Sequence, residues 1–282
     1  MTKILTCIDG SAYADNICEN TAWIANKLKA EISLLHVLRR HSDYEALSDH
    51  TGTIGLGARS RLLEKLSNVD EERARLDQQK GNLILDHGEE LLTSKTEHKI
   101  TRLHRRGSLE KTIQELEPEH DIIVIGKRGE HAALESDYLG SNLEKVARSV
   151  TKPIFLVSSV LRPIKQFMIA YDGKASKKVV DHVCSSPLLK GLECHFVTIE
   201  KTAGETDTKE ALTDLRNAGF EVTQKSIQHE HPDDALSSYA LENDIDLLAI
   251  GAYSHSRIRS IFLGSTTASL IKKCKIPLLL IR

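Results

Sequence analysis

The sequence has few aromatic residues, no excess of charge of either sign and no long apolar run. Aromatic residues make up 4% of the 282 residues, and 38 basic side chains are balanced by 40 acidic ones, for a formal net charge of −2. These values speak against a nucleic-acid-binding protein, which needs a basic surface or aromatic side chains that stack on bases. No stretch approaches the ~18 apolar residues of a membrane-spanning helix, and the segment from Met1 to Asp9 reaches an acidic residue too early for a secretory signal. We therefore expect no nucleic-acid partner and no membrane partner.

The cysteines follow no disulfide or metal-binding pattern, and no familiar catalytic motif is present. The five cysteines are odd in number and contain no C-x-x-C pair, so reduced, buried thiols in a cytoplasmic protein are expected. The sequence has no P-loop, no G-x-S-x-G elbow and no Ser/His/Asp constellation. His229 and His231 lack a third ligand for a metal, and His36 and His195 lie in or beside expected strands as core or strand-end histidines. The sequence thus predicts neither an enzyme nor a metal site.

The chain contains one pattern twice. The openings match, since an apolar run ends in Asp-Gly at Lys3–Gly10 and again at Gln166–Gly173. The closings match as well: an apolar run ending in glycine, a loop, a Leu-Gly-Ser sequence, a helical segment and a last apolar run, at 121–157 and at 246–281. Such an ordered repeat indicates a tandem duplication. We expect two domains, at 1–158 and 164–282.

Within each half, short apolar runs alternate with segments of helical spacing. Runs such as Ile32–Val37 and Ile154–Val157 are too short for helices and lack polar alternation, which is typical of strands buried on both faces of a parallel sheet. Alternating strands and helices imply right-handed crossovers. The predicted fold class is α/β, with two doubly wound, mostly parallel five-stranded sheets and flanking helices.

The first half is longer by an insertion at about 39–75. Its loop-like part includes residues 51–57, and the rest has a helical stripe formed by Leu62, Leu66, Val69 and Leu76. The simpler interpretation is a helical extension that packs on its own domain. The alternative is a docking surface for a second copy of the chain or for another protein.

The candidate ligand site lies where the strands of each half end. Open parallel sheets bind ligands at the carboxyl ends of their strands. Asp9 and Asp172 close the first strand of each half, where a carboxylate can accept a hydrogen bond from an exocyclic amine, and the backbone around Val37 and Val197 can contact a flat base. A glycine loop then leads into the last helix, so that main-chain N–H groups and the helix N-terminus can hold a phosphate. Its residues are Gly126, Gly129, Gly140 and Ser141 in the first half, and Gly251, Ser254, Gly264, Ser265 and Thr266 in the second.

These motifs together resemble a tandem universal stress protein. ATP-binding members of that family carry G-x2-G-x9-G-[ST] after the fourth strand and an aspartate that meets adenine at the end of the first. The resemblance implies an adenine-nucleotide alpha-hydrolase-like fold and a ligand such as ATP, AMP or ADP, with Mg²⁺. It implies an internal pseudo-dimer that places Ile154–Val157 beside Leu278–Ile281. It also implies a role as a stress-response switch or scaffold.

Each half departs from the family motif in a different way. In the first half the spacing between Gly129 and Gly140 is one residue too long, and acidic residues in this loop would repel a triphosphate unless a cation or Lys127 and Arg128 offset them. In the second half Ser254 replaces the second glycine, but the spacing is correct and the loop is basic. The sequence therefore favours the second half for nucleotide binding. The alternative is an interaction protein with degenerate sites that recruits a protein partner through 39–75, and pairing of the chain with itself stays open.

Overall fold

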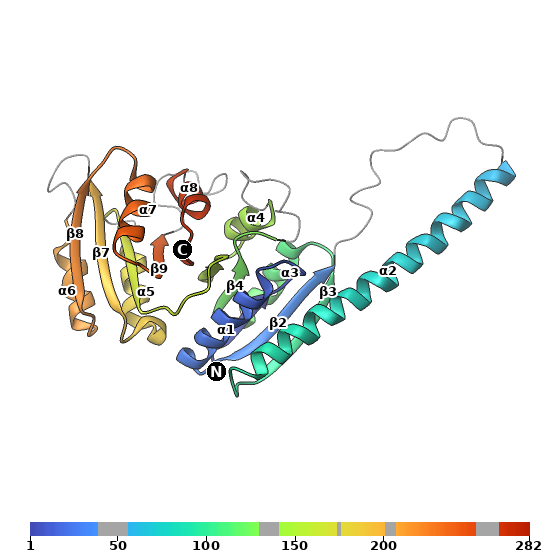
Figure 1. The fold of residues 1–282 in the computed structure, drawn as a ribbon, viewed down its shortest axis with the longest axis horizontal. Coiled ribbons are helices and arrows are strands. Elements are labelled where there is room, and N and C mark those ends of the chain that lie inside the picture. Colours follow the sequence, from blue (N-terminus) through green and yellow to red (C-terminus); the bar gives the residue numbers. More distant parts are fainter. Residues whose placement is uncertain (39–55, 130–140, 174–175, 201–206, 252–264) are drawn as a thin grey trace.

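The computed structural model describes residues 1–38, 56–129, 141–173, 176–200, 207–251 and 265–282. These form one ten-stranded sheet with helices on both faces (Figure 1). The elements of the first half are β1 (Lys3–Cys7), α1 (Ala14–Leu28), β2 (Glu31–Leu38), α2 (Leu56–Thr93), β3 (Ile100–Arg106), α3 (Leu109–Leu116), η3 (Glu117–Glu119), β4 (Ile122–Gly126), α4 (Ser141–Ser149) and β5 (Ile154–Val157). Those of the second half are β6 (Gln166–Tyr171), α5 (Lys177–Ser185), η6 (Pro187–Leu189), β7 (Glu193–Glu200), α6 (Lys209–Asn217), β8 (Val222–Gln228), α7 (Pro232–Glu242), β9 (Leu247–Gly251), α8 (Ser265–Lys273) and β10 (Leu278–Ile281).

The strand order shows the duplication directly. It runs β3-β2-β1-β4-β5-β10-β9-β6-β7-β8, so each half has the same doubly wound order, read inward from its outer edge. Neighbouring strands are parallel except β5 and β10, which pair antiparallel with Leu279 opposite Phe155. The predicted fold class and internal pseudo-dimer are confirmed. The two five-stranded sheets are joined into one continuous sheet through their last strands.

The core lies on both faces of this sheet, as the unbroken apolar runs predict. All residues of β4, β5 and β10 are buried. Phe155 and Leu279 belong to the apolar cluster on one face, and Leu156 and Leu278 belong to the cluster on the other. Because both clusters continue across the junction of β5 and β10, the two halves share their core.

A matching aspartate lies at the start of β4 and of β9. Asp121 Oδ2 accepts a hydrogen bond from the backbone N–H of Lys3 at 3.0 Å. Asp246 Oδ2 accepts the corresponding bond from Gln166 N–H at 3.2 Å, and a further one from Lys165 N–H at 2.9 Å. The repeat seen in the sequence therefore extends to equivalent side-chain contacts.

The structure of α2 differs from the expectation that the insertion packs on its own domain. Its helical part and the helix before β3 form one helix of 38 residues, whose amino-terminal part extends away from the domain (Figure 1). Between residues 69 and 80 no residue is buried, and the first buried position in the described side chains of α2 is Gly81. The interpretation that this extension packs on its own domain is thus wrong for residues 69–75. Residues 39–55, with most of the loop-like part, lie outside the described residues.

The length of α2 gives the physical reason. A helix of 38 residues is about 57 Å long, whereas the seven residues of β3 span about 23 Å. The sheet can therefore cover only the carboxyl-terminal part of the helix. In the described parts of the chain, no helix combines the length and the apolar character that crossing a membrane requires.

Candidate functional site

The carboxyl ends of β1 and β2 form the first side of the candidate site. The last backbone hydrogen bond between these strands runs from Ile8 N–H to the Leu35 carbonyl, at 2.9 Å. Asp9 follows immediately, and its Oδ1 accepts a hydrogen bond from Ser11 N–H at 3.1 Å. Val37 lies two residues beyond Leu35 on β2 and is half-buried. Asp9 and Val37 therefore lie at one edge of the sheet, where the two strands separate.

The glycine loop after β4 folds onto this edge. A β-carbon placed on Gly129 would lie 3.0 Å from Asp9 Oδ2, so a larger residue would crowd the carboxylate. A β-carbon on Gly126 would lie 3.1 Å from the Arg128 carbonyl and 3.3 Å from Ile17 Cδ1. Asp9 and the glycine loop at Gly129, which are more than a hundred residues apart in the sequence, therefore lie side by side.

The second half has the equivalent aspartate but a different local contact. Asp172 follows β6 and is exposed, and its Oδ1 accepts a hydrogen bond from the Ser176 hydroxyl. Gly251 ends β9, where it pairs with Ile281. The carboxylates of Asp9 and Asp172 therefore occupy corresponding positions at the ends of β1 and β6.

The strand register shows that Val197 lies within β7, before the strand end at which the sequence analysis placed it. Cys7 pairs with Leu35 in the first half, and Ala170 pairs with Val197 in the second. Val197 is accordingly the counterpart of Leu35, fully buried and three residues before the end of β7. The residue that corresponds to Val37 is Ile199, which sequence reasoning missed because the apolar run gives no signal for its own register.

The last helix of each half begins where the glycine loops predict. Helix α4 starts at Ser141 and α8 at Ser265, with Thr266 next. In a parallel sheet a helix that follows a strand begins at the strand's carboxyl end, so both helix N-termini face the edge that carries the aspartates. Gly140, Ser254 and Gly264 lie outside the described residues, as do the acidic residues of the first loop and the basic residues of the second.

Lys127 does not serve the phosphate-balancing role that the sequence suggested. Its side chain is buried, and Nζ donates hydrogen bonds to the carbonyls of Cys274 and Ile276, both at 2.7 Å. Burial lowers the pKa of Lys127 to about 7. The ammonium group therefore joins the two halves of the chain, and its neighbour Arg128 is exposed beside the loop.

The histidines have ordinary structural contacts. His36 Nδ1 lies 2.9 Å from the Ile8 carbonyl, and His195 Nδ1 lies 2.9 Å from the Tyr239 hydroxyl, as expected for core and strand-end residues. His229 Nδ1 accepts a hydrogen bond from His231 N–H at 2.9 Å in the turn before α7. Within the described ranges, no three potential ligands lie close enough to hold a metal ion.

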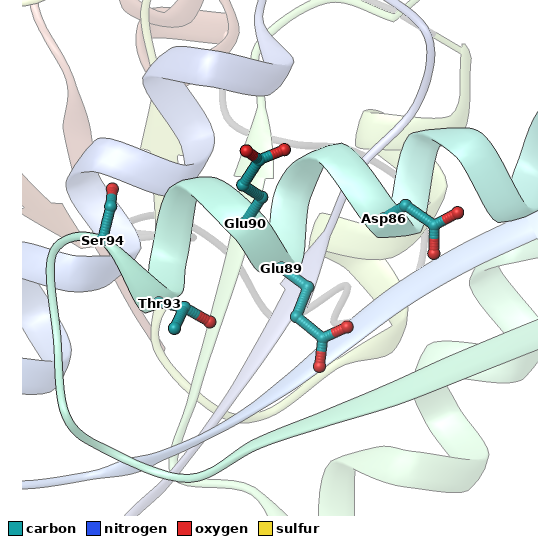
Figure 2. A pocket seen from close by; sticks show the side chains of 5 residues that line it. All are labelled: Asp86, Glu89, Glu90, Thr93 and Ser94. Carbon is teal, nitrogen blue, oxygen red and sulfur yellow. The ribbon is translucent and has the colours of Figure 1, made fainter.

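An open acidic hollow of about 470 Å³ lies beside α2 in the first half. It is lined by Asp86, Glu89, Glu90, Thr93 and Ser94, near the carboxyl terminus of α2 (Figure 2). Asp86 and Glu89 form ion pairs with Arg102 of β3, at 2.7 Å and 3.4 Å. Because Gly81 of α2 lies beside His36 near the end of β2, the helix runs opposite to the strands. The hollow therefore lies beyond Gly81 in the direction of the amino ends of the strands.

Comparison with known proteins agrees with this arrangement. The model of the universal stress protein family matches residues 1–158 and 179–282. A curated universal stress protein from Synechocystis sp. is 35% identical over 291 residues, with full coverage of both chains.

Two solved structures show the same fold over the whole chain. A universal stress protein from Archaeoglobus fulgidus has a TM-score of 0.63 at 17% identity, covering 99% of this chain and 96% of its own. A protein of unknown function from Pseudomonas aeruginosa has a TM-score of 0.62 at 15% identity, covering 100% and 92%. With two family matches, a full-length relative and a doubly wound pseudo-dimer, the chain belongs to the universal stress protein family.

Proposed function

We propose that the chain binds an adenine nucleotide at the carboxyl edge of one or both halves and acts as a nucleotide-responsive switch or scaffold in stress responses. The approach of Gly129 to Asp9, at 3.0 Å between Oδ2 and the position of a β-carbon, carries this proposal. It supports a site built from the residue types that the family motif requires. The proposal assigns no chemical step to any residue, so it describes a binding protein and not an enzyme.

Asp9 would recognise the base. A carboxylate has about four lone-pair positions, so Asp9 can accept several hydrogen bonds, and the exocyclic amine of adenine would donate one of them beside the bond from Ser11 N–H. The backbone near Val37 lies across the opening between β1 and β2 and would contact the flat ring. In the second half the corresponding residues are Asp172 and Ile199.

The glycines and helix N-termini would hold the phosphates. Gly126 and Gly129 allow the backbone after β4 to lie close to neighbouring atoms, and α4 begins at Ser141 beyond the loop. Main-chain N–H groups and the positive end of a helix dipole favour an anion at such a place. Mg²⁺ would accompany the phosphates and offset part of their charge. Gly251, Ser254, Gly264, Ser265 and Thr266 would serve the second half, whose basic loop favours it.

A thermal-shift titration with ATP and Mg²⁺ tests the proposal. At 100 times the dissociation constant, a ligand adds about 2.7 kcal/mol to the free energy of unfolding. We expect Asp9→Ala or Asp172→Ala to reduce the shift, and the variant that reduces it more identifies the half that binds more tightly. Asp181→Ala removes an exposed aspartate on α5 and should leave the shift unchanged. No shift at millimolar ATP would contradict nucleotide binding.

The exposure of Val69 and Leu76 on α2 favours a second candidate function. In this alternative the nucleotide sites are degenerate, and the chain acts as an interaction protein that recruits a protein partner through its insertion. A chain that gives no thermal shift but retains a specific protein partner would support it. We further propose 1–158 and 164–282 as the two folding units, and the cytoplasm as the compartment because all five cysteines are free thiols.

A further inference from the structure

Helix α2 begins to rest on the sheet at a pair of histidines. His36 of β2 and His104 of β3 lie opposite each other in the strand register, with ring centres 5.5 Å apart. Gly81 of α2 lies against both rings, because a β-carbon on this residue would collide with His104 Nε2 and lie 2.9 Å from His36 Cδ2. No residue of α2 from 69 to 80 is buried. The two rings therefore mark the point at which the helix leaves the sheet.

The contacts of His104 suit a neutral ring. Its Nδ1 lies 2.9 Å from Gln78 Nε2 and 3.0 Å from Asn82 Oδ1, both on α2. Its Nε2 is enclosed and has no hydrogen-bond partner in the described part of the chain. A neutral imidazole carries one N–H, which can stay on Nδ1 where Asn82 accepts it, whereas an imidazolium carries an N–H on both nitrogens. The N–H on Nε2 would then be buried without an acceptor, which is costly.

The charged groups of the sheet also oppose protonation of His104. His36 lies beside it on β2, and Arg102 and Arg106 lie on either side of it along β3. Burial of the ring lowers the pKa of His104 below its ordinary value of 6.5, and these three neighbours lower it further. A positive charge on His104 is therefore disfavoured as long as α2 covers the ring.

The charged groups of α2 do not offset this effect. Asp86 and Glu89 are the acidic side chains of α2 that contact β3, and both form ion pairs with Arg102. Asp77 and Lys80, on the same part of the helix, are engaged in other interactions. In the described part of the chain, no carboxylate is bonded to the histidine ring.

The second half shows that the fold does not require histidines at these positions. The repeat places Thr198 where His36 lies, and Ser226 where His104 lies, and these two residues pair in the register of β7 and β8. Neither hydroxyl titrates near neutral pH. The helix between β7 and β8 is α6, with nine residues, whereas α2 has 38. The titratable pair therefore lies in the half whose helix extends beyond the sheet.

We propose that His36 and His104 form a pH-sensitive switch for the docking of α2: the neutral pair holds segment 78–84 on the sheet, and protonation of His104 releases this segment. Release would lengthen the undocked part of α2 as far as Leu85, which is 1% exposed and belongs to the apolar core. The helix beyond that residue stays docked, because Gly88 packs against apolar side chains of the sheet. The proposal does not depend on nucleotide binding.

Proton linkage gives the direction of the switch. When α2 is undocked, the His104 ring meets water and has the ordinary pKa of 6.5, and when α2 is docked its pKa is lower. Above pH 6.5 the ring is neutral in both forms, and docking has its full strength. As the pH falls below 6.5 the undocked form binds the proton first, so docking weakens. Between pH 7.5 and pH 5.5 the docking equilibrium should change about tenfold.

Amide hydrogen exchange of the full chain tests the switch, with rates corrected for the intrinsic effect of pH. We expect the protection of residues 78–84 to fall about tenfold from pH 7.5 to pH 5.5, while residues 89–92 of the same helix keep theirs. His104→Gln keeps a hydrogen-bonding side chain that does not titrate, and it should remove this pH dependence. His231→Gln makes the same change at an exposed histidine and should leave the pH dependence as in the wild type.

An NMR titration of the wild-type histidines needs no variant. The His104 ring should titrate below pH 6.5, and the amide signals of residues 78–84 should shift with the same midpoint. A His104 ring that titrates at or above pH 6.5 would overturn the proposal. So would a segment 78–84 that has no protection at pH 7.5, that keeps its protection at pH 5.5, or that loses it equally in His104→Gln.

Discussion

Lys127, at the end of β4, reaches across the molecule to the carbonyl of Cys274, which follows the last residue of α8 in the other half. The matching contact runs the opposite way: Arg282, after β10, donates to the carbonyl of Val150, which follows α4. Each half therefore places a cation at the carboxyl-terminal end of the other half's last helix. Cations are favoured there because the helix dipole leaves partial negative charge on the last carbonyls. This pair of contacts reinforces the junction of β5 and β10.

Replacing Lys127 by methionine should change how stability depends on pH. Burial lowers the pKa of Lys127 to about 7, from an ordinary value of 10.5. Below about pH 7 both the folded and the unfolded chain carry the proton, and the full cost of burying the charge is present. Between pH 7 and pH 10.5 the unfolded chain binds more protons than the folded chain. The free energy of unfolding of the wild type therefore rises with pH relative to that of Lys127→Met, by up to about 1.4 kcal/mol per pH unit. Urea unfolding of both proteins at several pH values across this window measures the difference, and a constant difference would contradict the assignment.

Replacing Gly81 by alanine should destabilise the protein although alanine is the better helix former. The gain in helix propensity is about 1 kcal/mol. A β-carbon at Gly81, however, would lie 2.4 Å from His104 Nε2 and 2.9 Å from His36 Cδ2. We expect a net loss of about 1–3 kcal/mol, because two rings must move. Gln79→Ala, at an exposed position two residues earlier, is the control for propensity, and equal effects of the two substitutions in urea unfolding would contradict the close contact.

The duplicated aspartates provide a matched pair of substitutions. Asp246 is buried, accepts hydrogen bonds from Lys165 and Gln166, and forms an ion pair with Arg162 at 3.0 Å. Asp121 is exposed and makes the corresponding bond to Lys3. We expect Asp246→Ala to cost about 2–4 kcal/mol and Asp121→Ala about 1 kcal/mol. Calorimetry of both variants tests this ranking, and an equal or reversed order would show that burial does not set the cost.

The second half alone should form a dimer. In the full chain β10 is completely buried beside β5, so residues 164–282 alone would expose an unpaired apolar edge strand. We expect two copies to pair antiparallel through β10, giving twice the mass of the fragment. This fragment contains no α2, so the dimer cannot involve that helix. A folded monomer in sedimentation experiments would contradict both the edge-strand argument and the domain boundary proposed at 164.

Much of the fold could be predicted from the sequence because its signals are local. Strands buried on both faces require unbroken apolar runs, and the runs at 121–126 and 246–251 repeat in the same context. The first apolar run of each half ends at Asp9 and at Asp172, which places both aspartates at the carboxyl edge of the sheet. The runs at 121–126 and 246–251 end at the glycine loops, which places these loops at the same edge. The pairing of β5 with β10 followed from the family resemblance, since an apolar run does not specify its neighbour.

The sequence by itself determined the duplication, the doubly wound halves and the edge of the sheet that carries Asp9, Asp172 and the glycine loops. Only the tertiary structure decided that Lys127 joins the two halves, that Ile199 and not Val197 corresponds to Val37, and that α2 continues beyond the sheet. The physical reason is the same in each case. Register, helix coverage and the partner of a buried charge depend on contacts between residues far apart in the chain, and the residue pattern around one position does not contain those contacts.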